Sequence, residues 1–448
     1  MNRDKARSDG FLLLCLGSLT FVALGFLMLM ARKDSGLDFR IAYSAARCLV
    51  LHRDPYSEAE LLQTYQENGG TLPQGGVETL RSEALYIYLP TIFSATIPLL
   101  VFPMSVAYIL WTALAALGFL IAAVMMWEVG KDRAPLLTGV LLCFYLVNSG
   151  SLISTGNAAS LALSLGVIGA CCILRERWAI AGVLCLAASL AIKPHDSAFL
   201  WLALLLFGGT FRKRALQSLA AMIGVSLPFL VWVWRIAPQW MDEMRAHIAI
   251  LSAHGAVSDP GPATVLNRGT LMLTNLQALF SLMRDDPRFY NTASYAVCLV
   301  MAAVAIAVGA RRRSTEDARW LAMAFASALS LLPVYHRQYD SKLLILTIPA
   351  CALLWARRGR FGKAAVLVTA LGFVATSDLP WAFYLAGTSG MQLSGVAAKL
   401  YFISLAAPVP TVIAGMAMFY LFSYIRENRV SAPAEPIVSE TQRVVSIN

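Results

Sequence analysis

The chain has 448 residues, of which 58% are hydrophobic and only 14% charged, and its mean hydropathy is +0.64. These values exclude an ordinary soluble globular protein and indicate an all-α polytopic membrane protein. The formal net charge of +10 could indicate a nucleic-acid partner, but the basic residues gather in short clusters between apolar segments, as orientation signals of membrane proteins do. Nucleic-acid binding is therefore not expected.

The first apolar segment, 11–31, has the length that crosses the hydrocarbon of a bilayer. It follows Arg3, Lys5 and Arg7, and no small-residue cleavage site stands behind it. We therefore expect a retained first span whose N-terminus lies in the cytoplasm.

A polar loop, 32–85, follows this span and contains an amphipathic stretch from Asp38 to Tyr56. If Asp38 caps a helix, Arg40, Ser44 and Arg47 fall on one face and apolar residues on the other, which predicts a helix lying in the membrane interface. Pro55 ends the helix, because the residue before a proline is pushed out of helical geometry. Asp38 is then either only a helix cap or the catalytic base of the protein.

Twelve further apolar segments follow the loop. All are expected to be helices, because backbone polar groups in lipid must be satisfied within their own segment. The segments lie at 86–101, 104–127, 133–148, 157–174, 178–192, 197–209, 214–234, 293–310, 318–333, 341–356, 361–376 and 402–424.

Basic clusters in the short connections between these segments predict which side each connection faces. By the positive-inside rule these connections are cytoplasmic, so the loops at 32–85 and 235–292 face outward, as do the loops near 150, 195, 336 and 385. The outer loop 235–292 is long enough for two short helices, around 241–251 and 270–283. Residues 1–424 are expected to form one membrane-embedded catalytic domain, and 425–448 a disordered cytoplasmic tail.

The number of segments creates a parity problem. Nine of them separate the first outer loop from His336, so one must not cross if both are to face outward. Either 86–101, which is short and carries two prolines, is re-entrant, or 178–209 is a single helix kinked at Pro194. Both choices leave about twelve transmembrane helices and two cytoplasmic termini.

Two clusters of ionisable residues stand between apolar segments, where an unpaired charge is costly. The first is Lys193-Pro194-His195-Asp196, and the second is Tyr335–Asp340 with Lys342. Lysine, arginine and histidine suit a lipid-linked phosphate. The alternative is an ordinary polar loop, in which Lys193 pairs with Asp196, and Arg337 with Asp340.

Several short stretches that cover nearly the whole chain form a pattern by their order and spacing. They are Asp38, Asp54-Pro55-Tyr56, Tyr86-Ile87-Tyr88-Leu89-Pro90, Gly156-Asn157, Ile192-Lys193-Pro194 and Tyr335-His336-Arg337-Gln338-Tyr339-Asp340. This pattern resembles that of glycosyltransferase family 87, which consists of membrane enzymes of the GT-C fold class that use polyprenyl-phosphate-linked sugars, typically mannose.

The resemblance implies an inverting transfer of a hexose to a glycolipid or glycan acceptor at the outer face of the bacterial inner membrane. It makes Asp38 the general base and His336 the second catalytic residue. The residues expected to bind substrate are Arg40, Tyr88, Asn157, Lys193, His195, Arg337, Tyr339, Asp340 and Lys342. Asn157 is alternatively a helix cap, and Tyr88 a residue of the interfacial aromatic belt.

No metal ion or other cofactor is expected to be needed. Lys193, Arg337 or Lys342 could neutralise a lipid monophosphate, and basic groups could thus stabilise the departing phosphate while a carboxylate takes the proton of the acceptor hydroxyl. The eight cysteines show neither a disulfide framework nor a zinc-binding spacing.

Two other classes of protein remain possible on sequence. A transporter of lipid-linked sugars would more naturally show charges deep in its spans and related halves, and no internal repeat is visible. A polysaccharide ligase or polymerase also has many spans and a large outer loop, but it would rely on outer arginines and a histidine without an acidic base at Asp38.

Overall fold

The computed structural model describes residues 3–31, 36–73, 76–256, 258–261, 273–310, 315–378 and 407–430, and the single positions 396, 400 and 404. Across these ranges the chain is helical and has no strand, as expected for a membrane protein. The helices long and apolar enough to cross a membrane are α1 (Arg3–Ala31), α6 (Met104–Gly130), α7 (Pro135–Val147) continued by α8 (Ser151–Ser154), α12 (Gly209–Ile236), α16 (Pro287–Gly309) and α22 (Pro408–Val430).

Shorter apolar helices fill the space between these long ones. Most residues of α9 (Ala158–Leu174), α17 (Glu316–Ser330) and α18 (Thr347–Ala356) are buried, so these three helices form the interior of the bundle. The total of about twelve spans stays a prediction. The shorter helices are α9 (Ala158–Leu174), α10 (Ala179–Ile192), α11 (Pro194–Leu206), α17 (Glu316–Ser330), α18 (Thr347–Ala356) and α19 (Arg360–Ala375).

The segment predicted at 86–101 is broken into three short pieces, η1 (Pro90–Ile92), α5 (Phe93–Thr96) and η2 (Ile97–Val101). The helical rise is about 1.5–2 Å per residue, so even end to end the three pieces are shorter than the ~30 Å of hydrocarbon in a bilayer. This agrees with the re-entrant alternative. In the other alternative, 178–209 is a single helix kinked at Pro194. The chain there forms two helices, and Lys193 between them has a non-helical backbone with φ −152° and ψ 85°, so the helix is interrupted next to Pro194. Which of the two segments does not cross the membrane stays a prediction.

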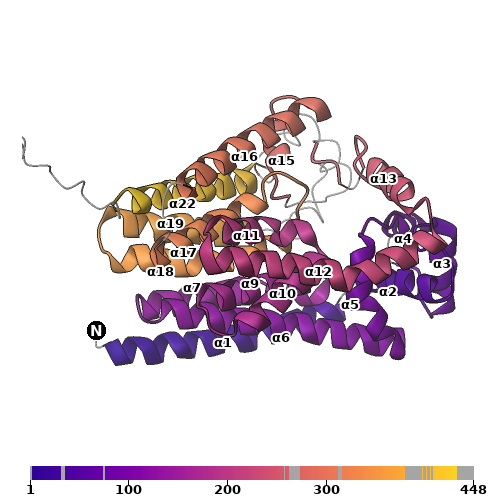
Figure 1. The fold of residues 1–448 in the computed structure, drawn as a ribbon, viewed down its shortest axis with the longest axis horizontal. Coiled ribbons are helices and arrows are strands. Elements are labelled where there is room, and N and C mark those ends of the chain that lie inside the picture. The colour runs from indigo at the N-terminus through magenta and orange to yellow at the C-terminus, as the bar shows by residue number, and fades with distance from the viewer. Residues whose placement is uncertain are drawn as a thin grey trace, which may run out of the picture.

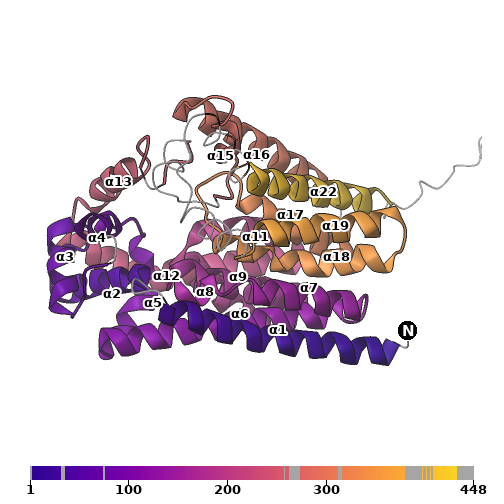
Figure 2. The same cartoon turned by 180° about the vertical axis from the view of Figure 1, so that it is seen from behind.

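The helices of the loop 32–85 lie at one end of the bundle, away from the N-terminus, together with the first helix of the loop 235–292 (Figures 1 and 2). There α2 (Leu37–Val50), α3 (Glu58–Glu67) and α4 (Gly76–Ala84) gather with α13 (Trp240–Leu251), which confirms the helix predicted around 241–251. The Tyr56 ring lies 5.7 Å from that of Trp240, and His247 Nδ1 lies 3.1 Å from the Tyr86 carbonyl. The end of the bundle therefore carries a common cap built from both loops.

The predicted cap of α2 is wrong. The helix begins at Leu37, its N-cap is Gly36 with φ +73°, and Asp38 already lies in the first turn. The predicted polar face is also wrong at Ser44, which is fully buried. Because α2 packs against α3, α4, α5, η2 and α6, it has no one-sided apolar face left to insert into a bilayer.

Two other boundaries differ from prediction. The last helix, α22, continues to Val430, so the polar tail cannot begin at 425; Arg426 stacks on the Phe361 ring and Glu427 pairs with Arg357, which extends the helix. The helix expected at 270–283 is only α15 (Leu276–Phe280) in the described residues. The loop near 385 and the tail from 431 lie outside the described residues.

Glycines allow α1 to approach α7 and α8 very closely. A Cβ atom on Gly10 would lie 2.6 Å from the Pro135 carbonyl oxygen, and one on Gly17 would lie 2.7 Å from Cys143 Cα. One on Gly25 would lie 2.5 Å from the Ile153 side chain. At Gly10 and Gly17 the nearest atoms belong to backbone, so only glycine fits there, as is common where membrane helices pack backbone to backbone; at Gly25 the Ile153 side chain would have to move. This contact fixes the helix that leads directly to Asp38.

Candidate active site

Asp38 is held by an asparagine from the start of another helix. Asn157 Nδ2 donates to Asp38 Oδ2 at 2.7 Å, and it also lies 3.2 Å from the Tyr339 hydroxyl and 3.4 Å from the Tyr88 hydroxyl. Asn157 Oδ1 accepts from the backbone N–H of Ala159, so the residue caps α9 as predicted. One amide thus caps a helix and joins three of the predicted site residues.

Two glycines bring Asp38 and Asn157 into contact. Gly36 and Gly156 have φ values of +73° and +66°, which residues with a side chain rarely adopt. A Cβ on Gly156 would lie 2.9 Å from Gly36 Cα, so the backbones before α2 and α9 touch. The indole of Trp111 fixes the same turn by donating to the Gly156 carbonyl at 3.2 Å.

Glu83, on α4, is a site residue that the sequence analysis missed. Burial, followed by the charge of Asp38, raises the pKa of Glu83 to about 8, although Arg337 acts in the opposite direction. The side chain lies within hydrogen-bond range of Asp38. At neutral pH Glu83 is therefore mainly protonated and can donate to the Asp38 carboxylate. No spacing distinguishes it from the other glutamates of this loop.

The Lys193 ammonium lies between two carboxylates and a tyrosine ring. Its Nζ pairs with Asp340 Oδ1, lies 3.7 Å from Asp196 Oδ2 and sits 5.5 Å from the centre of the Tyr339 ring. The residue is only 8% exposed. The predicted pairing with Asp196 is therefore present, and Asp340 adds a second partner that the sequence did not suggest.

Arg337 also contacts Asp340, but through its backbone. Its N–H donates to Asp340 Oδ2 at 2.8 Å, while its guanidinium donates to the Tyr335 hydroxyl. The predicted ion pair between the Arg337 and Asp340 side chains is not present among these contacts. The charge of the guanidinium acts on Glu83 instead, where it opposes the rise in pKa caused by burial and by Asp38.

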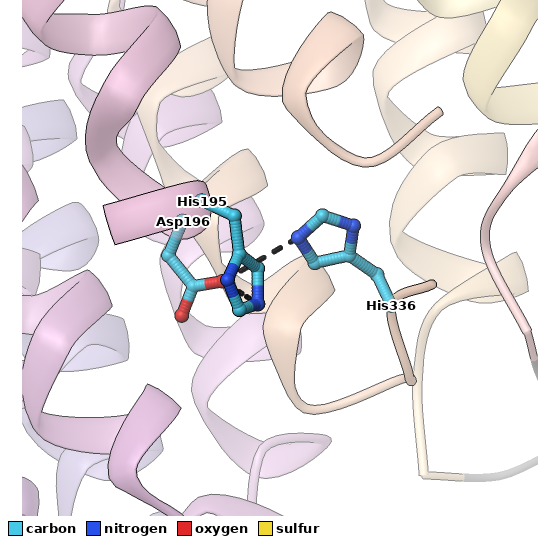
Figure 3. A group of neighbouring side chains, drawn as sticks. All are labelled: His195, Asp196 and His336. Atoms are coloured by element: carbon cyan, nitrogen blue, oxygen red, sulfur yellow. Dashed lines mark ion pairs between the residues drawn. The ribbon is translucent and has the colours of Figure 1, made fainter. Parts of the chain in front are cut away.

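Two histidines and an aspartate form the third group in the site (Figure 3). His336 Nε2 and His195 Nε2 lie 3.4 and 3.7 Å from Asp196 Oδ1, and the two rings are 5.1 Å apart. His336 and Asp196 are buried, whereas 43% of the His195 side chain is exposed. His195 and Asp196 come from the first turn of α11, and His336 from the loop before η3 (Asp340–Leu346).

Lys342 and Arg40 lie apart from these groups. Lys342 is fully buried and donates to the carbonyls of Asn148 and Thr376 at 2.8 and 2.7 Å, with Asp378 at 3.7 Å. These contacts join the end of α7 to the end of α19. The guanidinium of Arg40 stacks 5.8 Å from the centre of the Tyr108 ring. A substrate contact by either residue stays a prediction.

An apolar groove runs along α11 beyond the histidines. It lies between α11, α16 and α17 and is lined by residues that include Phe199, Leu202, Ala203, Ala302 and Phe325. Phe199 is four residues after His195, which is about one helical turn. The groove therefore begins next to the polar cluster.

The comparison with protein families matches residues 86–335 to glycosyltransferase family 87, which is more than half of the chain. Asn157 and Lys193 lie inside this range, whereas Asp38 and His336 lie outside it. Comparison with curated proteins and with solved structures gave no significant match. The family match and the long apolar helices together show that this multi-pass membrane chain belongs to glycosyltransferase family 87.

Proposed function

We propose that the chain transfers a hexose, with mannose as the first choice, from a polyprenyl-phosphate donor to a glycolipid or glycan acceptor. The reaction takes place at the outer face of the bacterial inner membrane and inverts the anomeric carbon, on a GT-C-type fold. The observation that carries the proposal is the contact of Asp38 with Asn157 and, through it, with the Tyr339 hydroxyl. That contact brings together three distant parts of the chain, and it places the Asp38 carboxylate near the Tyr339 ring, beside which the Lys193 ammonium lies.

Asp38 acts as the general base. Its carboxylate takes the proton of the acceptor hydroxyl as that oxygen attacks the anomeric carbon, and the bond from that carbon to the phosphate oxygen breaks. Asn157 holds the carboxylate in place at 2.7 Å. A single displacement by the acceptor gives inversion.

The donor phosphate would bind on the side of Lys193 and His195. Lys193 lies beside the ring of Tyr339, whose hydroxyl is 3.2 Å from Asn157 Nδ2, so a sugar between them would face Asp38. The apolar groove that starts at Phe199 would hold the first part of the prenyl chain. This arrangement favours a lipid-linked donor over a soluble sugar nucleotide.

The test is transfer by the purified protein in detergent with polyprenyl-phosphate mannose and, in parallel, other polyprenyl-phosphate hexoses. Asp38→Asn should lower the transfer rate by about 10²–10⁴-fold, the range of general-base catalysis. Asp242→Asn is the matched control, because this outer-loop carboxylate is 79% exposed and, within the part of the chain that the structure describes, pairs only with Arg245 at 3.3 Å. Full activity of a folded Asp38→Asn protein, or no transfer from any donor of this class, would overturn the proposal.

A further inference from the structure

We propose that His195, Asp196 and His336 bind a divalent transition-metal ion of the zinc type. The ligand atoms are His195 Nε2, Asp196 Oδ1 and His336 Nε2, which lie within 4.8 Å of one another (Figure 3). This site replaces the expectation from sequence that basic side chains alone neutralise the donor phosphate.

The distances fit a small ion. A tetrahedral zinc ion with ligand bonds of about 2.0–2.1 Å has neighbouring ligand atoms about 3.3 Å apart. Asp196 Oδ1 is already 3.4 Å from one imidazole nitrogen and 3.7 Å from the other. The remaining separation, between the two histidines, can shorten because the His195 side chain is partly exposed and free to rotate.

The buried ligand atoms make no hydrogen bonds to the described residues. Among the described residues, neither oxygen of Asp196 has a hydrogen-bond partner, and nor does His336 Nε2. The closest cation to Asp196 Oδ2 is Lys193 at 3.7 Å, too far for a hydrogen bond. A buried carboxylate that accepts no hydrogen bond is costly even with Lys193 nearby, and a bound cation would remove that cost.

The tautomer of His336 strengthens this argument. His336 Nδ1 lies 3.0 Å from the Val334 carbonyl, which can only accept a hydrogen bond. In the neutral ring Nδ1 therefore carries the proton, and the lone pair of Nε2 faces the carboxylate of Asp196. Two lone pairs 3.4 Å apart repel each other unless a cation lies between them. A ring nitrogen that donates to a carbonyl is also the usual outer partner of a metal-binding histidine.

Two imidazoles and one carboxylate select the kind of ion. Mg²⁺ and Ca²⁺ prefer oxygen ligands, whereas zinc and its neighbours bind imidazole well, and three protein ligands leave a position open. The nearby charges nearly cancel, because the carboxylates of Asp196 and Asp340 offset the cations of Lys193 and Arg337. An ion would supply the missing positive charge for a departing phosphate, and this last step rests on the proposed function.

The experiment measures metal binding and needs no sugar transfer. The detergent-purified full chain is loaded with Zn²⁺, freed of excess metal and analysed for metal content, and its affinity is measured by competition with a chromogenic chelator. The wild-type chain should retain one ion. His195→Ala, which alters a partly exposed side chain, and Asp196→Asn should each weaken binding by more than about 100-fold, since loss of an outer partner alone costs 10–100-fold.

His254→Ala is the matched control, because His254 also faces two carboxylates, Asp259 at 3.1 Å and Asp285 at 3.6 Å, but uses a different ring nitrogen for each. It should retain the ion. Loading with Co²⁺ should give a visible absorption band that His195→Ala abolishes. A folded wild-type chain that retains no ion, or a His195→Ala chain that retains as much as the wild type, would overturn the metal site. A wild-type chain that binds the ion but transfers no sugar would count against the proposed function alone.

Discussion

Replacing Lys342 by methionine should destabilise the protein without weakening donor binding by the folded fraction. The sequence predicts a phosphate ligand here, but the ammonium is fully buried and donates to the carbonyls of Asn148 and Thr376. The Asn148 carbonyl would keep the backbone N–H of Asp378 at 3.3 Å, so among the described residues the Thr376 carbonyl is the one that would lose its donor. An unsatisfied buried polar group costs about 1–3 kcal/mol, and the substitution should destabilise the fold by about that much. Asp378 adds less, because it keeps the donors of Ser151 at 2.9 and 2.8 Å.

The assay is thermal unfolding in detergent with a thiol-reactive fluorophore. It suits this chain because five of its cysteines, Cys48, Cys171, Cys172, Cys298 and Cys351, are buried and react only when the protein opens. Lys131→Met, which removes a surface pair with Glu128, should change stability by less than about 1 kcal/mol. If Lys342→Met unfolds at the wild-type temperature but loses donor binding, Lys342 is the phosphate ligand and the structural role is refuted.

Three further predictions concern the carboxyl pair, the tight turn and the groove. The pKa of Glu83 is about 8 in the folded chain, against an ordinary value of 4.5. Between these two pH values the folded chain binds a proton that the unfolded chain has lost, so the free energy of unfolding falls as the pH rises from 4.5 to 8. Unfolding scans should show this loss in the wild type and not in Glu83→Gln; equal slopes would refute it. Gly156→Ala should cost about 1–3 kcal/mol, because φ is +66° and the new Cβ would meet Gly36; an unchanged unfolding midpoint would contradict this. Ala203→Trp should narrow the groove and slow transfer from long-chain donors more than from short-chain ones, and equal slowing would show that the prenyl chain lies elsewhere.

The helices could be predicted because their cause is local. An apolar run in lipid must satisfy its own backbone, so almost every apolar segment became a helix close to its predicted range. The predicted start of α2 is wrong for an equally local reason. Asp38 is a residue type that often caps helices, but Gly36, in the left-handed conformation, already takes the N-cap position two residues earlier. Asn157 kept its predicted cap because its side chain has a free backbone N–H two residues on.

The site was predictable only in its components. Asp38 and Asn157 are 119 residues apart and meet through two glycines whose backbone angles the sequence does not reveal. Lys193 and Lys342 look alike in sequence, since each belongs to a short polar stretch beside an apolar helix. One faces the ring of Tyr339 and the other is enclosed by carbonyls. The choice between them depends on helix rotation within the bundle, which apolar periodicity cannot fix when a helix is buried all round.

The glycine contact between α1 and α7 has a consequence for biogenesis. The chain is made from its N-terminus, and roughly 100 residues separate the end of α1 from the start of α7. At 5–20 residues per second α1 would wait about 5–20 s in the membrane before its partner is synthesised. During that time Gly10, Gly17 and Gly25 face lipid or the insertion machinery. The peptide that carries Asp38 can therefore take its final position only after α7 and α8 have been synthesised.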